Sequence, residues 1–194
     1  MKPEDKFIEI LAENLSLILL PNEKIIELDL GCGKGTFSTE LAKKYPSRLV
    51  LATDVMIGRL RKLYKRNKRE KIENMRLLRG DAWFLFNQCI PDGKLSRVHI
   101  LCLDPWPKEK HRPNRLISSE FASRLHLKLC SDGVFHFSTD DKEYFESATG
   151  VIEKSGFFTR NDNAISDVTN IKTDFEKRWN QLGLDVFHAA WETS

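Results

Sequence analysis

A carboxylate and an aromatic side chain stand together where an apolar, strand-like run ends. Val98 to Leu103 leads directly into Asp104-Pro105-Trp106-Pro107-Lys108, whose two prolines break the strand and stiffen the loop. The carboxyl ends of strands form the ligand-binding edge of open α/β sheets, which favours a binding role for Asp104. The stretch that continues to Arg115 is basic, so an acidic or phosphate-bearing partner is expected beside this carboxylate.

Three more aspartates follow earlier strand-like runs, and the first of them opens a glycine-rich loop. The third glycine of this loop comes one residue too early for a dinucleotide fingerprint, and no nucleoside-triphosphate motif is present. One carboxylate suits an ammonium group, a second suits ribose hydroxyls and a third suits an adenine amine, which together favour S-adenosylmethionine. Each aspartate alone is more often a turn residue or a helix cap, but four in register argue for a site. The predicted cofactor contacts are Asp29, Gly31, Gly33, Gly35, Asp54, Asp81, Ala82 and Asp104.

Charge is unevenly distributed along the chain, although the net charge is only +3. The segment from Arg59 to Arg79 carries a local charge of +8, and Lys108 to Arg115 carries +3. Two basic segments near one acidic site are the electrostatic pattern of a nucleic-acid partner, whereas a solvated cationic helix is the simpler alternative for the first segment. We therefore expect Lys108, Arg112 and Arg115 to contact phosphates.

Composition limits the class of protein. The chain has 194 residues, of which 41% are hydrophobic, and this is enough for one compact domain over 1–194 with 1–22 as an N-terminal helix and lead-in. The four cysteines and five histidines show no metal-ligand spacing, so neither a metal site nor a disulfide framework is expected. No apolar run is long enough to cross a bilayer, and the N-terminus lacks a signal-peptide layout, which predicts a cytoplasmic protein.

Periodicity predicts alternating helices and strands, and hence a parallel sheet with helices on both faces. The expected helices cover 5–19, 36–44, 56–70, 82–89, 117–129, 141–155 and 173–182. The expected strands cover 24–30, 49–53, 75–78, 98–103, 134–138, 156–159 and 184–190. The fold class is α/β, a Rossmann-like seven-stranded sheet that is mostly parallel with one antiparallel strand.

With these residues in place, the chain resembles the class I S-adenosylmethionine-dependent methyltransferases, and within them the bacterial tRNA (guanine-N7)-methyltransferase family, which modifies guanosine 46. The specific segments are 104–108 with the basic stretch to 116, Ser138-Thr139-Asp140, and 173–178 followed by Leu182-Gly183. The last strand departs from the family's usual aromatic-Asp-Leu ending. The resemblance implies that tRNA is the partner, and that Lys108, Asp140, Thr173 and Glu176 bind the guanosine or its surroundings.

Guanine N7 has an exposed lone pair and no proton, so methyl transfer to it needs alignment rather than a base. The purine becomes cationic, and a nearby carboxylate stabilises that charge; Asp104 is the expected catalytic residue, with Asp140 as the second candidate. From sequence alone, Glu176 equally forms a capping pair with Thr173. The alternatives are a methyltransferase with another acceptor, namely other RNA, protein or a small molecule, or a catalytically silent RNA-binding relative. The sequence leaves monomer and homodimer open.

Overall fold

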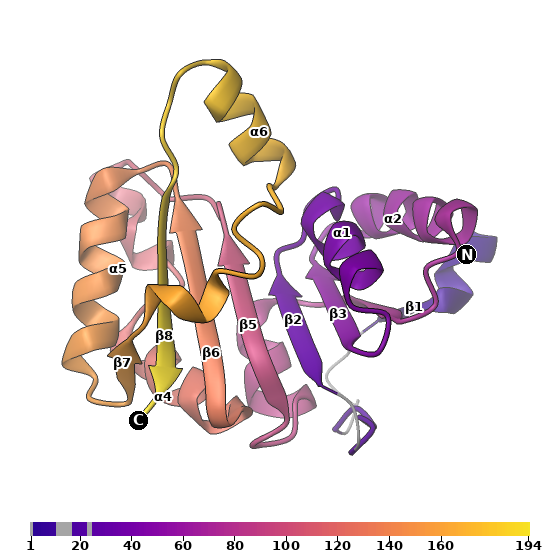
Figure 1. Ribbon diagram of the computed structural model, residues 1–194, viewed down its shortest axis with the longest axis horizontal. Helices are drawn as coiled ribbons and strands as arrows, with labels where there is room; N and C mark the ends of the chain where they lie inside the picture. The colour runs from indigo at the N-terminus through magenta and orange to yellow at the C-terminus, as the bar shows by residue number, and fades with distance from the viewer. Residues whose placement is uncertain (1, 11–16, 23–24) are drawn as a thin grey trace.

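The computed structural model describes residues 2–10, 17–22 and 25–194, and these form one sheet with helices on both of its faces (Figure 1). The strands are β1 Ile8–Ile10, β2 Ile26–Leu30, β3 Leu49–Asp54, β4 Met75–Arg79, β5 Leu95–Leu101, β6 Leu129–Thr139, β7 Phe158–Arg160 and β8 Phe187–Thr193. The helices are α1 Thr36–Lys44, α2 Ile57–Glu70, α3 Ala82–Phe84, α4 Ser119–Lys128, α5 Lys142–Lys154 and α6 Asp174–Gln181. A π-helical turn η2 Leu85–Cys89 extends α3, and short 3-10 helices are η1 Pro3–Phe7, η3 Glu109–Asn114 and η4 Asp162–Ile165.

The strand order is β1-β4-β3-β2-β5-β6-β8-β7. The pairs from β1 to β6 are parallel, whereas β8 runs antiparallel to both of its neighbours, β6 and β7. The parallel strands therefore end at one common edge, towards the top of Figure 1, where α6 also lies. This is the α/β sheet with an antiparallel strand that the sequence predicted.

Alternating side chains of the central strands divide the core into two layers. In β3, Leu49 and Leu51 join the apolar cluster that contains side chains of α4 and α5, including Phe121. Val50 joins the opposite cluster with Phe37 of α1, and Ala52 packs with Leu60 and Leu63 of α2. β3 is buried along its whole length, and its first four residues form a continuous apolar run, which is typical of a parallel strand covered on both faces.

Most of the predicted elements are present, and α1 has the predicted bounds. The predicted helix over 5–19 is wrong at its start: Pro3–Phe7 is a 3-10 helix and Ile8–Ile10 is an edge strand parallel to β4, which brings the sheet to eight strands. Residues 11–16 of that prediction lie outside the described residues, and 17–20 have no helical structure. Ile8 is buried against the sheet, and this contact outweighs the local helical spacing.

All seven predicted strands begin or end at other residues than predicted, and β5 and β6 are two of them. β5 ends at Leu101 because Cys102 has a positive φ of 51°, so Leu103 belongs to the loop. β6 begins at Leu129, five residues before the predicted start, where it pairs with Leu95 at an irregularity in β5. No helix of the described residues is long and apolar enough to cross a membrane.

Candidate active site

Five aspartates occupy the common edge at which the parallel strands end. Asp29 is the penultimate residue of β2, Asp54 is the final residue of β3, and Asp81 follows β4. Asp104 follows β5 and Asp140 follows β6. Since β4, β3, β2, β5 and β6 are successive neighbours in the sheet, the fold brings all five of these sequence-predicted residues to one rim.

The glycine-rich loop between β2 and α1 turns through three left-handed residues. Gly31, Gly33 and Gly35 have φ of 77°, 58° and 70°, which other residues adopt only with strain. A Cβ on Gly31 would come within 2.3 Å of Leu103, and one on Gly35 within 2.4 Å of Leu63. Glycine is therefore required both by the turn and by the close approach of neighbouring side chains.

Asp54 fixes this loop from the end of β3. Its Oδ2 accepts hydrogen bonds from the backbone N–H of Gly33 at 3.1 Å and from the guanidinium of Arg59 at 3.1 Å. Its Oδ1 accepts from the backbone N–H of Met56 at 2.7 Å, where α2 begins. A carboxylate offers about four acceptor positions, so three contacts leave capacity for one ligand hydroxyl.

Asp29 is the most perturbed acid at this edge. Its side chain is 2% exposed and accepts a hydrogen bond from the hydroxyl of Ser38 in α1. Burial raises the pKa of Asp29 to about 7, the Ser38 hydrogen bond opposes this shift, and the charge of Asp54 adds to it. A buried carboxyl with a raised pKa beside a left-handed loop is a functional-site candidate, because a cationic ligand would stabilise its charged form.

The loop after β5 is held in a strained conformation. Cys102 and Trp106 have positive φ of 51° and 47°, and these are two of the three non-glycine residues with positive φ in the described part of the chain. The carboxylate of Asp104 accepts from the backbone N–H of Trp106 at 3.0 Å and is otherwise exposed. Strain of this kind persists only where surrounding contacts impose it, and it clusters at functional sites.

Arg115 supplies one of those surrounding contacts, and this differs from its predicted phosphate role. Its Nε donates to the carbonyl of Pro105 at 2.9 Å, and its two terminal nitrogens donate to both oxygens of Glu143 at 3.0 and 2.8 Å. The guanidinium also lies 4.8 Å from the ring centre of Tyr144, and its side chain is only 8% exposed. Arg115 therefore ties the Asp104 loop to α5. Lys108 and Arg112 are exposed, and Arg112 also pairs with Glu143 at 3.4 Å.

The start of α6 also lies at this edge of the sheet (Figure 1). The Thr173 hydroxyl caps the helix by accepting from the backbone N–H of Glu176 at 3.0 Å, which is the Thr173 half of the predicted capping pair. The Glu176 half is not formed, because that side chain contacts Lys172 and His188 instead. Asp174 accepts from the hydroxyl of Thr36 at 2.7 Å, which joins α6 to the start of α1. Glu176 is 3% exposed; its Oε1 accepts from Lys172 and lies 3.1 Å from the Nε2 of His188. Asp140 is exposed, while its neighbour Asp141 caps α5.

Asp81 and Ala82 lie at the far side of the same rim. The carboxylate of Asp81 caps α3 by accepting from the backbone N–H of Phe84 at 2.9 Å, so it has the cap role that the sequence allowed. Its side chain is exposed, and Trp83 beside Ala82 is half-buried against Phe121.

Sequence reasoning missed three contributors to this edge. Ser38 holds Asp29, His188 holds Glu176, and the thiol of Cys102 lies 3.7 Å from the hydroxyl of Ser138. Burial raises the pKa of the Cys102 thiol, so it remains protonated and is a poor nucleophile. Only Ser38 carried a sequence signal, because it lies on the first helix after the glycine loop; the other contacts join distant parts of the chain.

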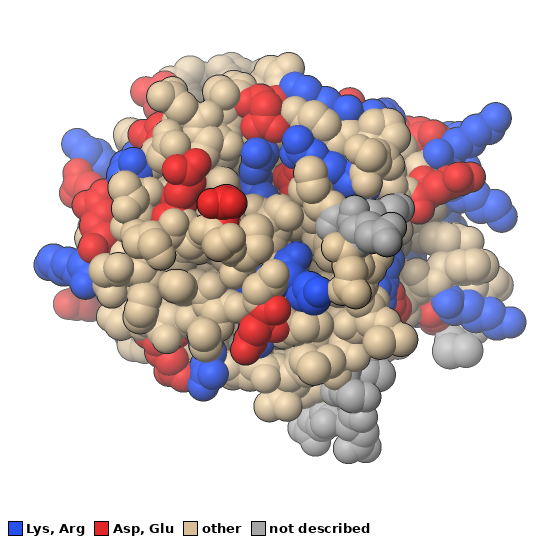
Figure 2. All heavy atoms as spheres, turned by 60° about the horizontal axis from the view of Figure 1, so that its bottom comes forward, with Lys and Arg blue, Asp and Glu red and all other residues tan. Residues whose placement is uncertain are grey.

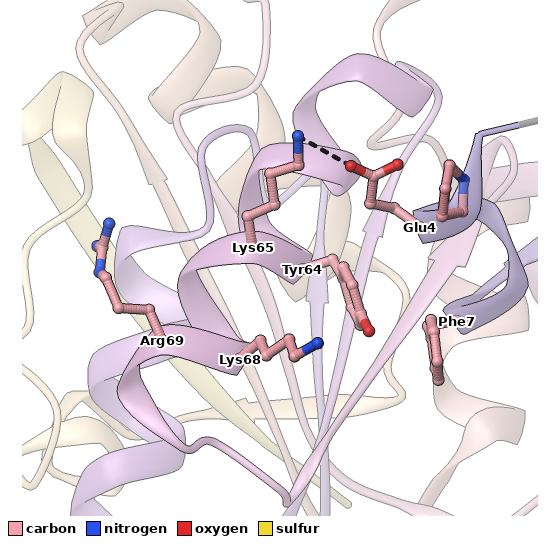
Figure 3. Close-up of a pocket in the computed structure, with 7 residues that line it drawn as sticks. Glu4, Phe7, Tyr64, Lys65, Lys68 and Arg69 are labelled. Atoms are coloured by element: carbon pink, nitrogen blue, oxygen red, sulfur yellow. Dashed lines mark ion pairs between the residues drawn. The ribbon is translucent and has the colours of Figure 1, made fainter.

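The basic segment on α2 is partly neutralised by the N-terminal segment. Arg61 makes a bidentate ion pair with Asp5 at 2.7 and 2.9 Å, and Lys65 pairs with Glu4 at 2.8 Å, as the dashed line in Figure 3 shows. Figure 3 also shows Phe7 and Tyr64 side by side, with ring centres 4.8 Å apart. In Figure 2, Lys and Arg side chains project from the right-hand edge with acidic side chains among them. The predicted cationic surface is present, but with a smaller net charge than the sequence count suggests.

Comparison with known proteins agrees with this geometry. A family model described as a putative methyltransferase matches residues 23–189. The tRNA (guanine-N(7)-)-methyltransferase of Nitrosococcus oceani is 33% identical over 165 residues, which are 85% of this chain and 68% of that protein. The chain belongs to the tRNA (guanine-N(7)-)-methyltransferase family.

Other members of the tRNA (guanine-N(7)-)-methyltransferase family are longer. The Thermus thermophilus relative is 32% identical over 173 residues, which cover 89% of this chain and 55% of that protein. The chain thus spans about half the length of that relative. Among solved structures, the 16S rRNA methyltransferase KamB aligns with a TM-score of 0.65 and 18% identity over 88% of each chain. A SAM-dependent methyltransferase from Aquifex aeolicus aligns with a TM-score of 0.58 and 12% identity over 88% of this chain and 82% of its own. These two similarities establish the class I methyltransferase fold.

Proposed function

We propose that this protein transfers a methyl group from S-adenosylmethionine to N7 of a guanine in tRNA, with guanosine 46 as the expected position, and that it acts in the cytoplasm. The observation that carries the proposal is the convergence of strand-end carboxylates and the Asp104 loop at one rim, in a chain of this family. The activity named for its relatives requires a cofactor cradle, a base site and a surface for RNA, and each has candidate residues here.

The residues at the β2 and β3 ends fit the cofactor. Asp29 is a buried carboxyl whose pKa is raised to about 7, as expected of a group that lacks a cationic partner. Asp54 retains acceptor capacity for a ribose hydroxyl, and the left-handed glycines let the backbone approach a ligand closely. We assign the cofactor contacts to Asp29, Gly31, Gly33, Gly35, Asp54, Asp81, Ala82 and Asp104.

When bound, S-adenosylmethionine supplies an electrophilic methyl group. The protein's own contribution is to align guanine N7 with that methyl, and near-attack positioning of this kind supplies about 7 to 11 kcal/mol. The strained loop fixes Asp104 at the strand end, where its exposed carboxylate can face the purine as positive charge develops. Asp140 lies on the adjacent strand end and can accept from the guanine edge.

Thr173 and Glu176 form the guanosine side of the proposed site, because α6 packs against the same rim through Thr36 and Asp174. Lys108 and Arg112 are the proposed phosphate contacts beside Asp104, together with the exposed face of α2. Arg115 serves this interaction indirectly by holding the loop.

The deciding experiment is incubation of purified protein with labelled S-adenosylmethionine and unmodified tRNA, followed by nucleoside analysis. We expect 7-methylguanosine in tRNA, and loss of that product in the Asp104→Asn variant with cofactor binding retained. Cofactor binding without a tRNA product would favour another acceptor. Failure to bind the cofactor by calorimetry would favour a silent RNA-binding relative.

A further inference from the structure

A continuous chain of three histidines crosses the sheet between two buried carboxylates. The Nε2 of His99 lies 2.9 Å from Glu27 Oε2, and its Nδ1 lies 3.0 Å from the Nδ1 of His136. The Nε2 of His136 lies 3.1 Å from the Nδ1 of His188, whose Nε2 lies 3.1 Å from Glu176 Oε1. The chain thus links β2, β5, β6 and β8 to the start of α6.

Water has little access to this chain. His99 and His136 are 0% and 2% exposed, and the ring of Phe37 from α1 packs against both at centre distances of 4.8 and 6.4 Å. Only His188, the end next to Glu176, has a partly exposed side chain, at 27%. The links of His99 to Glu27 and to His136 must therefore be satisfied within the protein.

Proton counting shows that three neutral imidazoles cannot satisfy all four links. Each link needs one proton, a neutral imidazole has one N–H, and an ionised carboxylate has none. If His99 donates to Glu27, then His136 donates to His99 and His188 donates to His136. His188 then turns a lone pair towards Glu176, where two acceptors face each other at 3.1 Å. A fourth proton is required for the complete chain.

The surrounding charges assign that proton to the end of the chain near α6. Burial lowers the pKa of His99, although the hydrogen bond and the charge of Glu27 oppose this shift. Burial also lowers the pKa of His136, and the neighbouring His99, His188, Arg97 and Lys172 lower it further. Glu27 is held ionised: burial would raise its pKa, but His99, Arg97 and Arg48 lower it to about 2.

At the other end of the chain, burial would raise the pKa of Glu176, but the bonds from His188 and Lys172 lower it. The charged groups facing His188 are Glu176 and Lys172, with His136 behind it. His188 is the most exposed imidazole of the three and the only one in contact with Glu176, so a positive charge on the chain costs least at this ring.

We propose that His188 is a positioning residue for guanosine recognition: as an imidazolium at the end of the His99-His136-His188 chain, it holds Oε1 of Glu176 and directs Oε2 to the base. This inference rests on the proposed function, in which Glu176 contacts the guanosine. The contacts of Glu176 with Lys172 and His188 both use Oε1. No hydrogen bond to Oε2 is found among residues 2–10, 17–22 and 25–194. That oxygen is left to accept from the N1–H or the amine of guanine.

The sign of the pH effect follows from the proton count. When the fourth proton leaves the chain at high pH, an acceptor faces an acceptor at the link between His188 and Glu176, and Lys172 alone holds Glu176. Glu176 then loses its fixed orientation, so the KM for tRNA rises with pH while the KM for S-adenosylmethionine does not.

Two variants of His188 separate the charge from the shape. His188→Phe removes the hydrogen bonds to His136 and Glu176. We expect the KM for tRNA to rise about tenfold with kcat unchanged, because the contact with guanosine is made equally in the ground state and the transition state. His188→Gln keeps an uncharged donor towards Glu176, so its KM should stay within about twofold of the wild type near pH 7 and lose its rise towards pH 9. His126→Gln, a histidine outside the chain on α4, is the matched control and should change neither quantity.

Imidazole nitrogen NMR of the ligand-free wild type tests the proton directly, without reference to activity. We expect one imidazolium and two neutral rings among the three histidines near pH 7. Three neutral rings would overturn the inference, as would an unchanged KM in His188→Phe when Glu176→Gln weakens tRNA binding. If neither Glu176→Gln nor His188→Phe alters the KM although the imidazolium is present, the guanosine role of Glu176 in the proposed function fails, and the positioning role with it.

Discussion

The raised pKa of Asp29 makes a quantitative prediction about stability. Its pKa is about 7 in the folded protein against an ordinary value of 3.8, so the folded state binds the proton more tightly than the unfolded state. The free energy of unfolding therefore falls as pH rises from about 4 to about 7 and then levels, by about 4 kcal/mol at most, given about 1.4 kcal/mol per pKa unit. Asp29→Asn removes this ionisation and keeps an acceptor for Ser38.

We expect Asp29→Asn to be more stable than the wild type by about 4 kcal/mol at pH 8 but by less than about 2 kcal/mol at pH 5. The assay is urea unfolding of the ligand-free proteins at both pH values, with S-adenosylmethionine binding measured by calorimetry. Asp29→Asn should bind the cofactor more weakly although it is more stable, because residues of a functional site often lower the stability of the fold. Asp132→Asn, at an exposed position of β6, is the control. An equal effect of Asp29→Asn at the two pH values would refute the reasoning.

Further changes test the loop, the charge and the RNA surface. Asp104→Asn keeps an acceptor for the Trp106 turn but removes the charge, and kcat should fall by about 10² or more with cofactor affinity unchanged; near-normal turnover would contradict its catalytic role. Gly35→Ala should lose about 2 kcal/mol and lower Tm by about 6 °C, because its φ is 70° and a Cβ would collide with a leucine of α2; an unchanged melting curve would count against this packing argument. Arg66→Glu combined with Arg69→Glu should weaken tRNA binding and make it less salt-dependent, as measured by filter binding, whereas Lys142→Glu on α5 should do neither.

The regular part of the fold was predictable because it is encoded locally. α1 lies between a glycine turn and Pro46, and its predicted bounds match the structure. The strand-end aspartates were predictable too, since the order of elements alone sends Asp29, Asp54 and Asp104 to one edge of a parallel sheet. Their contacts with ligands remain predictions.

The parts that could not be predicted depend on partners far apart in the chain. The N-terminal segment was wrongly predicted as a helix because its conformation depends on contacts with distant residues. Asp5 pairs with Arg61, and Glu9 pairs with Arg76, which is 67 residues away. Arg115 looked like a phosphate ligand because sequence shows its charge but not Glu143 beside it. The same limit hid the histidine chain, whose members are 37 and 52 residues apart.

The position of β8 between β6 and β7 has a consequence for biosynthesis. β7 has β8 as its neighbour in the sheet, so this edge cannot assemble while residues 187–193 are still inside the ribosome. Until β8 leaves the exit tunnel, β6 has no partner on one side, and its backbone edge is uncovered. Chaperones or aggregating chains can bind to such an edge. The half of the sheet that contains β6, β8 and β7, whose His136 and His188 support Glu176 of α6, should therefore form last.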